Sequence, residues 1–87
     1  MSKYTTGDVV RVILEPSYLN KKHFLTGYPE DIPLKLGQTY KILDVRQWED
    51  RDWYLRLMYT DKYGTPRSWN VLESAVSPLY TVEEELD

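Results

Sequence analysis

Prolines and a glycine interrupt residues 15–33, and this interruption limits the folds open to the chain more than any other feature. Pro16, Pro29, Pro33 and Gly27 exclude a long helix there, because proline lacks the backbone N–H and clashes with the preceding turn. The segment is therefore expected to form a long first loop between two strands. A loop of this length in a small domain is usually functional or packed on its own side chains.

Short runs of β-branched and aromatic residues, which are typical of strands, lie on both sides of this loop. They cover residues 8–14, 38–46, 53–60, 65–70 and 76–80, with a single helical turn expected at 71–75. Alternate residues of a strand share a face, so in the run 53–60 Leu55 and Leu57 share one face with Trp53 and Tyr59 and are the candidate core pair. The sequence thus predicts an all-β protein of about five short antiparallel strands, with one 3-10 turn.

Composition excludes several classes of protein. The chain has 87 residues, one histidine and no cysteine, so it is too short for a large α/β enzyme and carries no disulfide scaffold, zinc ribbon or thiol nucleophile. No phosphate-binding glycine loop, dinucleotide fingerprint or catalytic serine or zinc motif is present, and the carboxylates lack the spacing of a calcium loop. We expect no enzymatic activity, no cofactor and no metal ion.

The charge is unevenly distributed along the chain. The net charge is −3, but Glu83, Glu84, Glu85 and Asp87 contribute −4 within the last five residues. Without those four acids, 10 of the 14 remain against 11 basic residues, so residues 1–82 are close to neutral. We expect residues 1–82 to form the barrel and 83–87 to form an acidic, mobile tail, either a solvated terminus or a peptide that docks on a basic surface.

Three features of the chain follow one another in an order known from one family. Residues 34–37 (Leu-Lys-Leu-Gly) form a turn before the second strand, Trp53 lies in the third strand, and Gly64 leads into the fourth. Together with the long first loop and the helical turn before the last strand, this order resembles that of SH3-like barrels over residues 8–80. The resemblance implies a small barrel of five strands.

Peptide-binding members of that family have groove residues that this chain replaces. The first strand has no aromatic residue, and Asp52 stands where the groove tryptophan is expected, which leaves Trp53 as the packing tryptophan. Residues 68–71 read Ser-Trp-Asn-Val instead of Pro-Ser-Asn-Tyr. Because polyproline recognition needs an aromatic-lined groove, a polyproline ligand is not expected.

Trp48 is the first candidate for a binding site. It stands at the start of the charged connection 48–52, which also contains Arg51, and is expected to be partly exposed. Exposed tryptophan and arginine are the residue types that dominate interface energetics, with hot spots worth ~2 kcal/mol or more. The alternative is that Trp48 folds back and caps one end of the barrel.

The long first loop is the second candidate. It mixes aromatic residues with charges of both signs, a composition that suits a protein-binding surface. The expected contact residues are Tyr18, Phe24, Tyr28, Glu30 and Asp31. The alternative is a loop packed on its own Phe24, Leu25 and Tyr28, with its charges in solvent.

These observations predict a non-catalytic protein-binding module, such as an adaptor, accessory subunit or inhibitor. It would dock on another protein through the long first loop and the Trp48 connection, as a monomer or as a partner-dependent subunit. The chain contains no run of 18 apolar residues and its first residues do not resemble a signal peptide, so the cytoplasm is the expected location. A small regulator encoded by a bacterium or a phage would fit this description.

Two alternatives remain open from the sequence. The first is nucleic-acid or ribonucleoprotein binding, which requires the fold to gather the scattered cations beside aromatic residues. Those cations are Lys21, Lys22, Arg51, Lys62 and Arg67. The second is an obligate subunit in which Trp48 or Trp69 is buried by another chain.

Overall fold

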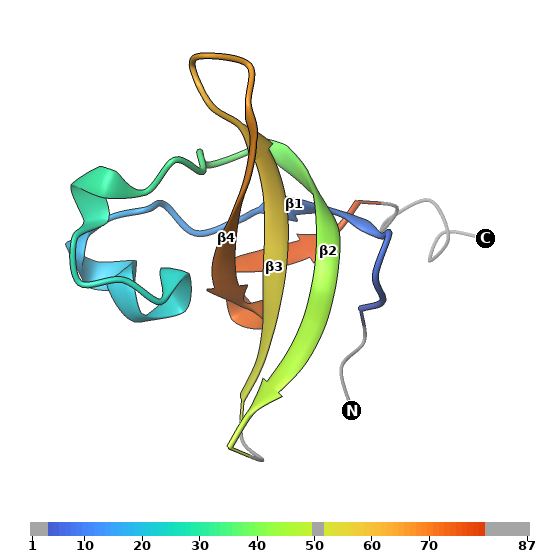
Figure 1. The fold of residues 1–87 in the computed structure, drawn as a ribbon. Helices are drawn as coiled ribbons and strands as arrows, with labels where there is room; N and C mark the ends of the chain where they lie inside the picture. Colours follow the sequence, from blue (N-terminus) through green and yellow to red (C-terminus); the bar gives the residue numbers. More distant parts are fainter. Residues whose placement is uncertain (1–3, 50–51, 80–87) are drawn as a thin grey trace.

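The protein, seen in a computed structural model that describes residues 4–49 and 52–79, is all-β (Figure 1). Its strands form one antiparallel sheet in the order β4-β3-β2-β1-β5. They are Val9–Val12 (β1), Thr39–Trp48 (β2), Asp52–Thr60 (β3), Pro66–Leu72 (β4) and Val76–Pro78 (β5). This confirms the predicted fold class, and the strand order is compatible with an SH3-like fold.

The strands are arranged so that the two ends of β3 point to different parts of the molecule. In Figure 1, β2, β3 and β4 run side by side, and β1 and β5 cross behind them. The β3–β4 hairpin projects from one end, the end of β2 lies at the other, and the long first loop forms a lobe at the side. The expected tail (83–87) lies outside the described residues.

The alternation of β3 confirms the predicted core pair. Leu55 and Leu57 are completely buried, while Arg56 between them is exposed, as the two-residue period of a strand requires. They pair across the sheet with Val71 and Trp69 of β4. β3 therefore contributes its apolar face to the core and its polar face to the solvent.

A register shift in β2 corrects the alternation that the sequence alone suggests. Ile42 is buried opposite Leu57, and a simple two-residue period would also turn Asp44 inward. The shift lies between Ile42 and Asp44, so that Val45 packs inward opposite Leu55 and Asp44 faces outward opposite Arg56. The irregularity thus keeps a carboxylate out of the core.

The long first loop contains short helical segments in place of the irregular chain expected there. Two 3-10 helices, Tyr18–Phe24 (η1) and Pro29–Asp31 (η2), lie within it, in addition to the expected 3-10 turn before the last strand, Glu73–Ala75 (η3). Prolines and a glycine exclude a long helix but permit single turns, and Pro29 occupies the first position of its segment, where its missing N–H costs nothing.

The core is built from every strand and from the long first loop. Its buried members are Tyr4, Val10, Val12, Phe24, Leu34, Ile42, Leu55, Leu57, Val71, Ala75 and Val76. Phe24 comes from the long first loop and Leu34 from the segment directly after it. The loop is therefore fixed to the sheet by its own side chains, which determines where its remaining residues can lie.

Candidate functional site

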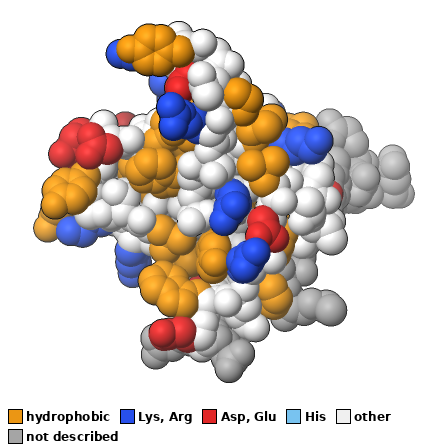
Figure 2. Space-filling view, viewed as in Figure 1, with side chains coloured by type: hydrophobic (Ala, Val, Ile, Leu, Met, Phe, Trp, Pro, Cys, Tyr) orange, Lys and Arg blue, Asp and Glu red, His pale blue; other side chains and the backbone are white. Residues whose placement is uncertain are grey.

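Trp48 lies at the end of β2, where β2 pairs with the start of β3, and beside a small cavity. The β2–β3 ladder extends through the pair Trp48 and Asp52, so Trp48 is the last residue of β2. The sequence had placed it in the connection between the two strands. Its side chain is 50% exposed, which confirms the expected partial exposure. Figure 2 shows hydrophobic side chains interleaved with charged ones on the face viewed in Figure 1.

The cavity, which we call the Trp48 pocket, has a volume of about 220 Å³. It is lined by Leu25, Trp48, Tyr54 and Asn70. Tyr54 lies on the face of β3 opposite Leu55, and so on the outer side of the sheet. The pocket joins the two regions that the sequence proposed for binding, because Leu25 belongs to the long first loop and Trp48 to the end of β2.

Leu25 adopts a backbone conformation that is rare for its type of side chain. It ends η1 with φ 52° and ψ 47°, in the left-handed region, and its N–H donates to the carbonyl groups of Lys21 and Lys22. A bulky residue with positive φ is unusual, and such a conformation persists only where the surrounding structure imposes it. Here the adjacent Phe24 is anchored in the core, which fixes the direction of Leu25.

Two hydrogen bonds hold the long first loop against the rest of the barrel. The indole Nε1–H of Trp69 donates to the Phe24 carbonyl oxygen at 2.8 Å. The Nδ1 atom of His23 lies 2.7 Å from Ser74 Oγ in η3. His23 therefore connects the loop to η3, and Trp69 packs against the core from β4.

Phe24 corrects one of the expectations for the loop. It was expected on the docking surface, but its side chain is fully buried in the core. The reason is its position at the end of η1, which turns the ring inward beneath β4. In this respect the loop packs on its own side chains, as the alternative from the sequence proposed.

The other expected contact residues of the loop are exposed but do not line the Trp48 pocket. They are Tyr18, Tyr28, Glu30 and Asp31. Tyr18 is covered in part by Lys21, whose Nζ lies 4.3 Å from the ring centroid. Arg51 lies outside the described residues. The structure thus brings Leu25 of the loop to Trp48, and leaves the exposed tyrosines and acids as separate features of the lobe.

A second cavity, which we call the hairpin cleft, lies at the opposite end of β3. Its volume is about 410 Å³. It is lined by Pro33, Tyr59, Thr60, Asp61, Lys62, Tyr63 and Arg67. Of the scattered cations noted in the sequence, the fold brings Lys62 and Arg67 together here, whereas Lys21 and Lys22 belong to η1.

Asp61 organises the hairpin. Its Oδ1 atom accepts backbone hydrogen bonds from Tyr63 and Thr65, and its Oδ2 atom lies 3.0 Å from Arg67 Nε. The pKa of Asp61 is lowered chiefly by the backbone hydrogen bond from Thr65, with further contributions from Arg67 and the Tyr63 backbone. The carboxylate therefore stays ionised at neutral pH, and the turn at 61–64 is held by one side chain.

The outer face of β2 carries a second ion pair. Arg46 Nε lies 2.6 Å from Asp44 Oδ2, and this hydrogen bond is the main cause of the lowered pKa of Asp44. Arg46 is exposed and Asp44 is partly exposed, so the pair adds little to stability. It gives the surface next to Tyr54 a balanced charge.

Sequence reasoning missed three residues of the Trp48 pocket as binding residues. Tyr54 was detectable only as the outward neighbour of the core pair, and Leu25 only as a loop residue with a packing role. Asn70 carried no signal by itself. What places the three together is the strand register and the burial of Phe24, neither of which can be read from local pattern.

Some features are absent from residues 4–49 and 52–79. Within these ranges no three His, Cys, Asp or Glu side chains are grouped as a metal ion would require. No helix in the described part is long and apolar enough to cross a membrane. No protein-family model matches the chain, and no curated protein and no solved structure shows significant similarity to it.

Proposed function

We propose that this chain is an SH3-like barrel that acts as a non-catalytic protein-binding module. The strand order β4-β3-β2-β1-β5, with the 3-10 helix η3 between β4 and β5, supports the barrel assignment. The long first loop between β1 and β2 stands where the resemblance places a long loop after the first strand.

The observation that carries the proposal is the half-exposed Trp48 beside an open cavity with a strained leucine as one wall. Tryptophan offers a large apolar surface and an indole N–H, and it is enriched among residues that dominate binding. Leu25 and Tyr54 supply apolar contact, and the Asn70 side chain offers both a hydrogen-bond donor and an acceptor. A partner would insert an apolar side chain into the Trp48 pocket.

The lobe formed by the long first loop enlarges the surface on offer. Its tyrosines are well exposed, and the acidic residues of η2 add negative charge that favours a partner with nearby Lys or Arg side chains. In this proposal the Trp48 pocket supplies most of the affinity and the lobe contributes orientation. The module works as an adaptor, accessory subunit or inhibitor in the cytoplasm, as a monomer or as a partner-dependent subunit.

Capture of a partner by matched variants tests this proposal. The immobilised full chain, its Trp48→Ala variant and its Tyr63→Ala variant are incubated with extract of the source cells at low and moderate salt. Trp48→Ala removes the pocket's indole, whereas Tyr63→Ala removes an aromatic residue that is even more exposed, at the other end of β3. Both variants are expected to keep the wild-type fold, because neither side chain belongs to the core.

The expected result is one protein retained by the wild type and by Tyr63→Ala but lost with Trp48→Ala. A hot-spot tryptophan contributes ~2 kcal/mol or more to the binding free energy, so its truncation is expected to raise the dissociation constant about thirtyfold. The proposal fails if the same proteins are retained by all three chains, or if only the Tyr63→Ala variant loses its bound material.

A further inference from the structure

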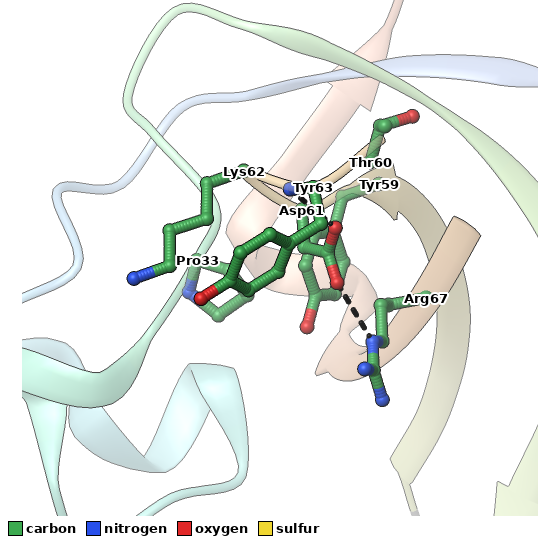
Figure 3. A pocket seen from close by; sticks show the side chains of 7 residues that line it. All are labelled: Pro33, Tyr59, Thr60, Asp61, Lys62, Tyr63 and Arg67. Atoms are coloured by element: carbon green, nitrogen blue, oxygen red, sulfur yellow. Dashed lines mark hydrogen bonds and ion pairs between the residues drawn. The ribbon is translucent and has the colours of Figure 1, made fainter. Parts of the chain in front are cut away.

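The hairpin cleft combines two aromatic rings with two cations in one opening, and the Trp48 pocket does not use any of these residues. Tyr59 is half-buried against the core and Tyr63 is 78% exposed at the tip of the hairpin. Figure 3 shows both rings and Pro33 gathered between Lys62 on one side and Arg67 on the other. A ligand in the cleft would therefore meet a ring surface with a positive charge on either side.

One of the two cations is held in place before any ligand binds, and the other lies over the Tyr63 ring. Arg67 is oriented through its Nε atom by Asp61, at 3.0 Å, which leaves its two terminal nitrogens for another acceptor. Lys62 Nζ lies 5.2 Å from the centroid of the Tyr63 ring. Asp61 itself already accepts hydrogen bonds from two backbone N–H groups and from Arg67, so its charge is partly compensated.

Planar aromatic surface flanked by cations matches the chemistry of a nucleotide. Any of the bases can stack on a tyrosine, whatever the nucleotide sequence. The phosphates on the 5′ and 3′ sides of that base carry the negative charge that Lys and Arg attract. An acidic peptide would use the cations but has no group that requires the two rings. A duplex would keep its bases stacked inside and would not present a ring to Tyr63.

We propose that the hairpin cleft binds one nucleotide unit of a single-stranded nucleic acid, with its base on Tyr63 and Tyr59 and its flanking phosphates at Lys62 and Arg67. This site is independent of the function proposed for the Trp48 pocket, because Tyr54 lines that pocket near the start of β3 whereas Tyr59 and Thr60 line the cleft at its end. With two phosphate contacts and one base, binding is weak and strongly dependent on salt.

The test is a titration of the isotope-labelled full chain with a uridine hexanucleotide, followed by the backbone amide signals. Uridines stack poorly on one another, so their bases are free to stack on the protein. A hexaglutamate peptide in parallel supplies a similar negative charge without bases. We expect the hexanucleotide to shift the amides of residues 59–67 in a saturable way at about 50 mM salt, and the peptide to leave them unchanged.

Variants separate the contributions of stacking and charge. Tyr63→Ala is expected to weaken binding about tenfold, whereas Tyr63→Phe keeps the ring and binds like wild type. Lys62→Gln is expected to reduce the slope of log affinity against log salt by about 0.7, the value for one single-strand phosphate contact. Trp48→Ala is the control and is expected to bind the oligonucleotide as the wild type does.

Three results would overturn the proposal. The first is a hexanucleotide that causes no shift at the cleft or shifts only other residues, such as those of η1. The second is hexaglutamate binding with the same shifts and affinity, which would make the cleft a general anion site or an acidic-peptide site. The third is unchanged binding by Tyr63→Ala, which would show that no base stacks on the Tyr63 ring.

Discussion

Phe24→Ala is expected to lower the free energy of unfolding by ~3–5 kcal/mol, the usual cost of removing a fully buried phenylalanine ring. The ring is completely buried, and the carbonyl of the same residue accepts the hydrogen bond from Trp69. A chain of 87 residues has a total stability of roughly 4–13 kcal/mol, so this single change removes much of it. Chemical denaturation measures this loss as a lower midpoint concentration of denaturant, with the dependence of the unfolding free energy on denaturant unchanged.

Leu19→Ala is the matched control for Phe24→Ala, because Leu19 lies in the same 3-10 helix but is 87% exposed. Its effect on the free energy of unfolding is expected to stay within ~0.5 kcal/mol. Where Phe24→Ala remains folded, it is also expected to weaken partner binding, because Leu25 loses the anchor that fixes its direction. Equal stability of the two variants would show that the long first loop is not part of the core.

Leu57→Ala is expected to lower the free energy of unfolding by ~2–5 kcal/mol. Leu57 is completely buried in β3 and pairs with Ile42 of β2 on one side and Trp69 of β4 on the other. The loss therefore affects both halves of the sheet at once. Thermal and chemical unfolding, measured side by side, give the change and show whether unfolding remains a single transition.

Met58→Ala is the control for this second change. Met58 follows Leu57 directly but faces outward and is 36% exposed. Truncation of the Met58 side chain is expected to lower the free energy of unfolding by less than about 1 kcal/mol, because a substitution on the outer face leaves no cavity in the core. If Met58→Ala were the more damaging of the two, the inward and outward faces of β3 would be reversed.

The regular part of the fold was predictable from local pattern. The alternation around Leu55 and Leu57 determined both the strand and its buried face, and the turn at 61–64 was signalled by Asp61 and Gly64, the latter with φ +81°. The register shift after Ile42 was not predictable. It depends on which residues of β3 lie opposite, since it places Val45 inward against Leu55.

The candidate site was predictable only in part. The exposure of Trp48 followed from its charged surroundings, but Phe24 was expected on the surface although it is buried. A loop residue of this type is equally suited to both positions, and only the tertiary structure decides between them. The meeting of Lys62 and Arg67 with two tyrosines likewise depends on the hairpin, whereas Lys21 and Lys22 lie in η1.

The two cavities make a pair of variants informative about both proposals. Trp48→Ala is expected to abolish capture of a protein partner while leaving oligonucleotide binding intact, and Tyr63→Ala is expected to do the reverse. Each variant thus serves as the control for the other. The two proposals can fail separately, because no residue lines both cavities.

The proposed function requires that Leu25 and Trp48 form one binding surface. The most direct measurement is a double-mutant cycle by calorimetry on the captured partner, with Leu25→Gly, Trp48→Ala and the double variant. Glycine suits the left-handed backbone at φ 52°, so Leu25→Gly removes the side chain and is expected to change stability by no more than ~1 kcal/mol.

Because the two residues share a pocket, each single variant is expected to weaken binding at least tenfold, with a coupling energy of ~0.5–3 kcal/mol between them. Wild-type affinity in both single variants would show that neither side chain contributes to partner binding. Strictly additive losses would mean that the two residues contact the partner independently, and would contradict a single binding surface.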